Sequence, residues 1–254
     1  MKKRKRKIKW KKIISLLVII ICLSLIIFSS IKIINWFLSN KRNQQLKEQI
    51  NQYITINKEN TINDVEMPKY TIEWDKIKSQ NKDALAYLKV NNTNIDYIIL
   101  KGTNNSYYLN HNFNKENNIS GWVFADFRNN VDGTDKNLVV FAHDTKDGSM
   151  FGTLKNVLNK EWYINPDNYI IDLVTEQGLL QYQVFSVYNI MNEEYYIQTT
   201  FKKNEFSNFI NTIENRSIYN FNVNLTNEDN ILTLSTCSDN GLKRIVLHAK
   251  LLKY

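Results

Sequence analysis

The sequence predicts a mostly β domain, built as a closed barrel or a sandwich, that follows one membrane-spanning helix. Two observations predict the domain: seven or eight short apolar segments have the composition of strands, and only two segments between them have helical spacing. A third observation predicts the membrane-spanning helix: a long uncharged run directly follows a basic N-terminus. A length of 254 residues allows one sizeable domain besides such an anchor.

The composition excludes several protein classes. With 43% hydrophobic residues, 7 Gly, 2 Pro and 2 Cys, the chain is neither collagen-like, nor low-complexity, nor a disulfide scaffold. The net charge of +8 is concentrated, since residues 1–12 hold nine of the 33 basic side chains. The remainder carries 24 basic and 25 acidic residues, so the charge predicts no nucleic-acid site on the folded domain.

Residues 13–31 form the expected transmembrane anchor. A helix of these 19 uncharged residues is about 28 Å long, close to the ~30 Å hydrocarbon core of a bilayer. The basic tail 1–12 predicts a cytoplasmic N-terminus and an extracellular domain, with Trp10 and Trp36 near the two interfaces. A cleaved signal peptide is the alternative, although the apolar run is long and residues 29–32 are a poor cleavage site.

Between the anchor and the domain, residues 32–60 are expected to form an amphipathic helix or stalk. Leu46, Ile50, Tyr53 and Ile54 have helical spacing within 39–58. The domain itself is assigned to 61–254. It is expected to begin with an irregular stretch around Pro68 and a short helix and loop over 74–88.

Apolar and β-branched runs then predict the strands of the domain, and two stripes predict its helices. The strands are expected at 96–100, 122–124, 137–141, 169–174, 179–190, 231–235 and 244–252. The helices are expected over 150–158, with Ser149 as N-cap, and around 206–213.

Several common functional sites are absent from the sequence. It contains no phosphate-binding loop, GxGxxG, HExxH, CxxC or GxSxG motif, and three histidines make a structural zinc site unexpected. Asp126, Asp132 and Asp135 lack the spacing of a calcium loop and are interpreted as a surface loop. We therefore expect neither a metal nor a cofactor.

The two cysteines differ in their setting. Cys22 lies within the anchor and is interpreted as a small apolar residue, whereas Cys237 has no cysteine partner in the extracellular part. A lone cysteine outside the cell indicates a reactive or intermolecular thiol, or else a buried structural residue.

One combination of residues suggests catalysis. Cys237 follows an apolar run, residues 238–241 have turn composition, and Arg244 begins the next strand, so a hairpin would bring Arg244 toward Cys237. His143 ends a third strand, and all three could meet at one barrel rim. The thiolate would attack a carbonyl, the imidazole would transfer protons, and the guanidinium would hold the oxyanion. The alternative is that His143 only ends a strand and Arg244 is solvated.

At these residues the sequence resembles class B sortases. The resemblance rests on TLSTC at 233–237, KRIVLHAKL at 243–251 and FAHD at 141–144, with further similarity at 107–128 and 194–199. It extends over roughly 60–254. It implies an eight-stranded sortase-type β-barrel with N-terminal helices and, near 203–214, an added helix between two late strands.

The resemblance also implies an activity. Such enzymes are membrane-anchored cysteine transpeptidases of Gram-positive bacteria. They cleave secreted proteins after the threonine of a C-terminal sorting motif, NP-x-T-like in class B, hold the product as a thioester and transfer it to a peptidoglycan amine. The residues that the resemblance assigns are Cys237 as nucleophile, His143 as acid/base, Arg244 as oxyanion or substrate clamp, and Ser235, Asn105, Leu109, Tyr196 and Ile197 as substrate-binding residues.

Two departures and two alternatives accompany this resemblance. The segment from Cys237 to Arg244 is short for the class, and Phe141 stands where a tyrosine is familiar. One alternative is a pilin-polymerising or other-class sortase with a lysine acceptor. The other is an inactive, membrane-tethered module that binds cell-wall peptides.

Overall fold

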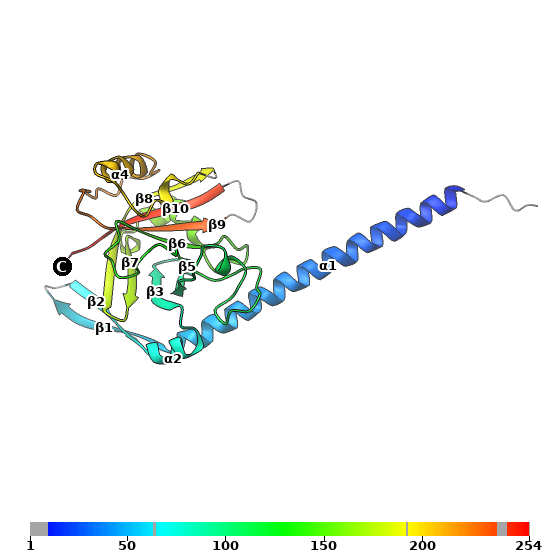
Figure 1. Ribbon diagram of the computed structural model, residues 1–254, viewed down its shortest axis with the longest axis horizontal. Helices are drawn as coiled ribbons and strands as arrows, with labels where there is room; N and C mark the ends of the chain where they lie inside the picture. Colours follow the sequence, from blue (N-terminus) through cyan, green and yellow to red (C-terminus); the bar gives the residue numbers. More distant parts are fainter. Residues whose placement is uncertain (1–9, 63–64, 192, 238–242, 254) are drawn as a thin grey trace, which may run out of the picture.

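A computed structural model describes residues 10–62, 65–191, 193–237 and 243–253. One long helix, α1 (Trp10–Asn51), leads into a β-barrel and projects far beyond it (Figure 1). The 19-residue apolar run lies wholly in the projecting part, where large side chains such as Phe28 are more than half exposed. An exposed apolar helix of this length is compatible with a membrane anchor. The turn at 238–241 and most of the basic tail lie outside the described residues.

The chain between α1 and the barrel differs from the expectation. The helix ends at Asn51, so the helix expected over 39–58 is wrong beyond that residue. A hairpin follows, made of β1 (Ile54–Ile62) and β2 (Val65–Ile72), and it contains Pro68, around which an irregular stretch was expected. This hairpin forms a separate two-stranded sheet. Proline is tolerated there because a strand at a sheet edge does not need every N–H for pairing.

Eight strands close a barrel within the described part of the chain, in the order β10-β8-β7-β3-β4-β5-β6-β9. Two neighbouring pairs, β4–β5 and β6–β9, are parallel, and the other pairs are antiparallel. The strands are β3 (Ala84–Val90), β4 (Asp96–Leu100), β5 (Phe124–Ala125), β6 (Asn137–His143), β7 (Ile170–Thr175), β8 (Gly178–Met191), β9 (Ile231–Cys237) and β10 (Lys243–Leu251). Of the barrel and the sandwich that the apolar runs allowed, the structure has the barrel, and the eight-stranded barrel that the resemblance implies is confirmed.

Local corrections concern short elements. Residues 74–88 hold a helix, α2 (Trp74–Gln80), but also most of β3, which was not expected. The helix expected over 150–158 is reduced to a 3-10 turn, η2 (Leu154–Leu158), followed by α3 (Lys160–Tyr163). The reason is a tight turn before η2, in which both Gly148 and Met150 have positive φ. Other short 3-10 turns are η1 (Tyr107–Leu109), η3 (Pro166–Asn168) and η4 (Tyr195–Ile197).

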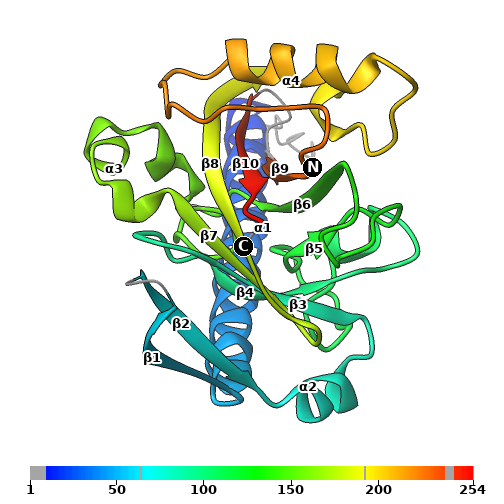
Figure 2. The ribbon, with the colours of Figure 1, turned by 90° about the vertical axis from the view of Figure 1, so that its left-hand side faces the viewer.

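The later helix, α4 (Glu205–Asn215), lies across the barrel over β8 and β10 (Figure 2). It buries one apolar stripe, which includes Phe206, Phe209 and Ile213, as the helical spacing predicted. The hydroxyl of Ser186 on β8 donates to the carbonyl of Ile213 at 2.6 Å. This is the added helix between two late strands, since it lies between β8 and β9 in the chain.

A long loop between β4 and β5 carries η1 to the barrel rim. Trp122 anchors its end: the indole N–H donates to the Ile98 carbonyl at 2.8 Å and the backbone N–H to the Tyr108 carbonyl at 2.9 Å. Gly121 has a φ of +54°, and a Cβ there would lie 2.2 Å from the Tyr108 oxygen. Only glycine permits this close approach, which holds η1 against the loop end.

Candidate active site

Parallel pairing brings Cys237 and His143 together. Strands β6 and β9 run side by side with seven consecutive register pairs, and the last pair is His143 with Cys237. Both residues end their strands, so they lie at the same end of the barrel. Neighbouring strands are about 4.8 Å apart, so the backbones of His143 and Cys237 lie side by side.

Arg244 lies at the same end of the barrel on β10. This strand pairs antiparallel with β9, where Val246 is opposite Ser235, and the backbone N–H of Ile245 donates to the Thr236 hydroxyl at 2.9 Å. Arg244 is two residues nearer the rim than Val246, and its side chain is half-buried. The strand register therefore places the backbones of Cys237, His143 and Arg244 at one rim of the barrel.

A pocket of about 320 Å³ opens beside these residues. Its floor includes two buried aromatic rings, Phe124 and Phe141, with centroids 5.5 Å apart. The lining residues are Asn105, Leu109, Phe124, Phe141, His143, Ile197 and Arg244. A largely apolar pocket of this kind can hold an extended peptide. Its imidazole, guanidinium and amide can bind polar or charged groups of that peptide at one place.

The imidazole of His143 is oriented by the loop opposite. Its Nε2 lies 2.7 Å from the backbone carbonyl oxygen of Leu109. A carbonyl oxygen only accepts hydrogen bonds, so Nε2 carries the hydrogen and donates it. In the neutral ring, the lone pair available for a proton is then on Nδ1.

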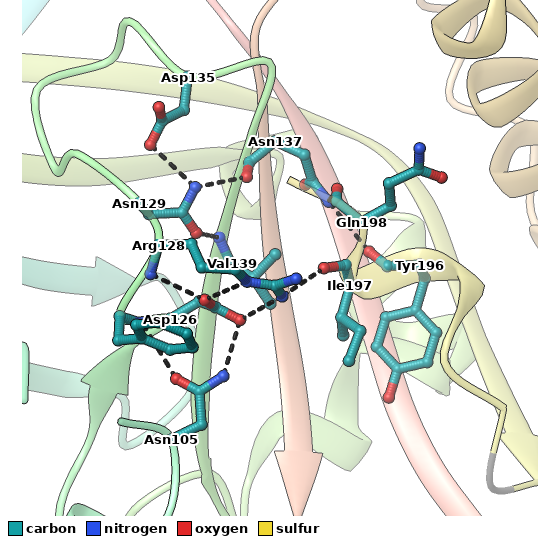
Figure 3. Close-up of polar contacts among 11 residues, drawn as sticks. Asn105, Asp126, Arg128, Asn129, Asp135, Asn137, Val139, Tyr196, Ile197 and Gln198 are labelled. Atoms are coloured by element: carbon teal, nitrogen blue, oxygen red, sulfur yellow. Dashed lines mark hydrogen bonds and ion pairs between the residues drawn. The ribbon is translucent and has the colours of Figure 1, made fainter. Parts of the chain in front are cut away.

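The wall of the pocket is held by an ion pair between the buried Asp126 carboxylate and the exposed Arg128 guanidinium (Figure 3). The Asp126 carboxylate, fully buried, accepts from Arg128 Nε at 2.8 Å and Nη2 at 2.7 Å, and from Asn105 Nδ2 at 2.8 Å. Burial by itself would raise the pKa of Asp126, but the hydrogen bonds from Arg128 and Asn105 outweigh it and hold the pKa below its usual value. Arg128 Nη2 also donates to the Ile197 carbonyl at 3.0 Å, so one pair positions two residues of the lining.

This arrangement corrects the interpretation of the three acids as a surface loop. Asp132 is exposed, but Asp126 is buried, and Asp135 is half-buried and accepts from Asn129 Nδ2 at 2.8 Å. The sequence signal for the ion pair is the Asp126-x-Arg128 spacing, in which the arginine can fold back on the carboxylate. Within the described residues, no group of three or more His, Cys, Asp or Glu side chains could hold a metal ion.

The five residues assigned to substrate binding divide into two groups. Asn105, Leu109 and Ile197 line the pocket. Tyr196 and Ser235 are buried behind it, 1% and 0% exposed, and their hydroxyl oxygens are 3.0 Å apart. The sequence analysis did not include Phe124 among these residues, because its apolar character does not distinguish a pocket floor from the core.

Behind the wall lies a second, fully buried histidine. His248 Nε2 is 2.8 Å from the Tyr188 hydroxyl, and Nδ1 is 2.8 Å from the Thr233 hydroxyl. Thr233 donates to Asn137 Oδ1 at 2.6 Å, so Thr233 accepts from Nδ1–H and Tyr188 donates to Nε2. Asn137 Nδ2 donates in turn to the carbonyls of Tyr196 and Gln198, which connects this core network to η4 (Figure 3).

Comparisons with known proteins agree with this architecture. A family model for the sortase domain matches residues 88–252. The chain is 33% identical over 238 residues to sortase B of Listeria monocytogenes, with 91% of this chain and 94% of that protein covered. Sortase B of Bacillus anthracis, solved in complex with AAEK1, superposes with a TM-score of 0.72 at 30% identity, over 86% of this chain and 100% of that one.

A further solved structure is the sortase B–substrate complex of Staphylococcus aureus. It has a TM-score of 0.66 and 34% identity, and the alignment covers 70% of this chain and 84% of that one. The family match extends over more than half of the chain, and the Listeria monocytogenes relative, at 33% identity, covers 91% of it. The chain therefore belongs to the sortase family of cysteine transpeptidases, in its class B.

Proposed function

We propose that this sortase cleaves secreted proteins after the threonine of an NP-x-T-like sorting motif, holds the product as a thioester on Cys237 and transfers it to a peptidoglycan amine. The observation that carries the proposal is the register of β6 and β9, which pairs His143 with Cys237 beside an apolar pocket that Arg244 also lines. The Staphylococcus aureus relative has been solved as a sortase B–substrate complex, which supports a substrate-binding role for this chain.

In the first half-reaction the Cys237 thiolate attacks the threonine carbonyl carbon, and a C–S bond forms. The tetrahedral intermediate collapses, the C–N bond breaks, and the leaving amine takes a proton from the His143 imidazolium. In the second, an acceptor amine attacks the thioester carbon and gives a proton to His143. The C–S bond then breaks and the thiolate is regenerated.

The geometry of His143 indicates which nitrogen moves the proton. Because Nε2–H donates to the Leu109 carbonyl at 2.7 Å, we assign proton transfer to Nδ1. Leu109 thus has two proposed roles, because its side chain lines the substrate pocket as well.

Arg244 is the proposed clamp for the substrate carbonyl and its oxyanion. A guanidinium keeps its charge at any working pH, and its N–H groups can stabilise negative charge on the tetrahedral intermediate. Asn105, Leu109 and Ile197 are proposed to contact the sorting peptide. Tyr196 and Ser235 are proposed to support that wall from behind, since their hydroxyls are buried against each other.

We further propose that residues 13–31 anchor the enzyme in the cell membrane with residues 1–12 in the cytoplasm and the barrel outside. The asymmetry of basic residues supports this orientation. The amphipathic part of α1 after residue 32 then connects the membrane to the domain at 61–254, and its buried residues Leu46 and Ile50 pack on the barrel.

The test is to incubate the full-length chain in detergent with a panel of sorting-motif peptides and to measure intact mass. We expect an acyl adduct that ends in threonine, lost in Cys237→Ala. The matched control is Cys22→Ala, because Cys22 is the only other cysteine and lies in the anchor, so its adduct should persist. An adduct that survives Cys237→Ala, or no adduct with any motif on a folded protein, would contradict the proposal.

A further inference from the structure

A second hollow meets His143. It has a volume of about 230 Å³ and is lined by Trp36, Ile119, Ser120, His143 and Thr145. Among the residues that the structure describes, His143 is the one that this hollow shares with the substrate pocket. A transpeptidase must bring two substrates to one acid/base residue, and two separate hollows that meet at His143 fit that requirement.

A larger hollow continues from this one along α1. It has a volume of about 440 Å³ and is lined by Trp36, Phe37, Asn40, Lys41, Gln44 and Asp147. Both hollows are lined by Trp36, so we describe them together as the helix groove. One side of the groove is the anchor helix itself, and the other side is formed by the segments 119–120 and 145–147.

Buried amide contacts hold α1 in one position against the barrel. Asn43, 1% exposed, donates to Gly121 O at 3.0 Å and exchanges hydrogen bonds with the Asn118 amide at 3.2 and 2.8 Å. Asn118 also donates to the Ser39 carbonyl at 3.0 Å. Paired amides of this kind are satisfied in only one register, so the groove is formed before any ligand arrives.

The groove contains a buried donor without an acceptor. Asn40 is 5% exposed, and its Oδ1 accepts from the Ser120 hydroxyl. Its Nδ2 has no hydrogen-bond partner among the residues that the structure describes. A buried amide N–H is normally paired, and this one lies covered from solvent in the helix wall of the groove.

The groove offers one carboxylate and two aromatic rings to an amine-bearing ligand. Asp147 is an exposed carboxylate at its edge, and Trp36 and Phe37 present aromatic rings to the same space. An ammonium group is attracted by a carboxylate and by aromatic faces. The Lys41 ammonium is also in the lining and would repel a highly cationic ligand. The groove therefore suits a short peptide with one amino terminus.

We propose that the helix groove binds the amine-bearing acceptor peptide and delivers its amine to His143. This proposal rests on the proposed transpeptidation. The amine nitrogen attacks the thioester carbon, its proton passes to His143, and the C–S bond breaks to release the thiolate. The anchor helix is then part of the acceptor site, and Trp36 is a substrate-binding residue.

The test uses the full-length chain in detergent, a sorting-motif peptide that acylates it, and triglycine amide as acceptor. In Trp36→Ala and Asp147→Asn we expect the rate of acyl-enzyme formation and its hydrolysis by water to stay within about twofold of the unmodified protein. The KM for triglycine amide should rise about tenfold in Trp36→Ala and less in Asp147→Asn.

Two matched controls accompany these variants. Leu38→Ala removes an exposed apolar side chain from the same helix outside the groove and should leave the acceptor KM unchanged. N-acetyl-triglycine amide lacks the amine and should neither react nor compete. An unchanged acceptor KM in Trp36→Ala would overturn the proposal. A loss confined to acylation would do so too, because the groove would then bind the donor peptide.

A binding measurement separates this proposal from the proposed function. Triglycine amide is titrated against the full-length Cys237→Ala chain and followed by ligand-observed NMR, with Trp36→Ala added in a second protein. Binding that is lost in the double variant supports the acceptor site even where no acyl adduct forms. Equal binding to both proteins overturns it, whatever the activity of Cys237.

Discussion

The two histidines on the barrel strands show how position along a strand decides the chemistry of an imidazole. His143 ends β6, is half-buried, and lines two hollows. His248 lies in the middle of β10, is 0% exposed, and has hydroxyl oxygens 2.8 Å from each ring nitrogen. At the strand end, Nε2 of His143 faces the Leu109 backbone carbonyl beside a pocket, whereas in the mid-strand, inward position both ring nitrogens of His248 face side-chain hydroxyls of the core.

The pKa of His248 agrees with a structural role. Complete burial lowers the pKa of this imidazole from its ordinary 6.5 to about 3, so the ring is neutral in the folded protein. The neutral ring is what the network requires, with Nδ1 as donor to Thr233 and Nε2 as acceptor from Tyr188. The comparison therefore predicts that His143 variants lose activity and His248 variants lose stability.

The largest expected effect is on the activity of the rim histidine. His143→Ala should reduce transpeptidation by about 10³-fold, since general acid–base catalysis contributes about 10²–10⁴-fold. The thermal unfolding midpoint should change little, because His143 lies at a strand end. The measurement is the steady-state rate with a sorting peptide and an amine, beside a melting curve. A variant that keeps its rate, or that fails to fold, would remove the contrast between the two histidines.

The second-largest expected effect is the pH dependence that the buried His248 gives to the free energy of unfolding. The folded-state pKa lies below the unfolded one, so the unfolded chain binds the proton more readily. The contribution of the neutral His248 to the free energy of unfolding is fully present above about pH 6.5 and is lost as the pH falls from there toward 3. At pH 5 the loss is about 2 kcal/mol.

Urea unfolding at pH 7 and pH 5 measures this loss. His248→Gln should be less stable than the unmodified protein at pH 7, yet should lose less between the two pH values. The lowered pKa values of Asp126 and Asp229 act below about pH 4, so they do not interfere in this window. An identical pH dependence in both proteins would show that His248 does not remain neutral when folded.

The smallest expected effect concerns the pocket wall that Asp126 and Arg128 hold, behind which His248 lies. Arg128→Gln removes the paired hydrogen bonds to Asp126 and the contact with the Ile197 carbonyl. Because Asn105 and Ile197 lose their positioning, the KM for the sorting peptide should rise about tenfold while kcat changes little. Arg216→Gln, which breaks an exposed ion pair with Glu193 outside the pocket, is the control. A fall in kcat with unchanged KM would assign Arg128 to the chemical step instead.

Local sequence patterns predicted most strands of the barrel but not the short helical turns and the hairpin that precedes the barrel. The runs at 96–100 and 137–141 became β4 and β6 within two residues, because apolar strands of a closed barrel carry their own composition signal. The helix expected over 150–158 was wrong, because Gly148 and Met150 turn the chain there and only a 3-10 turn follows. β2 was missed because Pro68 usually ends regular structure, and an edge hairpin tolerates it.

The residues of the candidate site could be predicted in part from the sequence. Cys237, His143 and Arg244 each end or begin an apolar run, so their common rim could be expected from strand ends. Asp126 could not be distinguished from a surface acid, because its burial depends on Asn105 and Arg128 folding over it. Trp36 was read as an interfacial aromatic, and nothing in its local sequence connects it with His143, 107 residues later.

The sequence by itself determined the long apolar segment, the strand composition and the residue types able to carry acyl transfer, since each depends on neighbours within a few positions. The tertiary structure alone decided which of these meet. Parallel pairing of β6 with β9 sets His143 beside Cys237, and packing of α1 on the barrel brings this helix to the same imidazole. Such contacts depend on strand register and on burial of distant surfaces against each other, which no local pattern encodes.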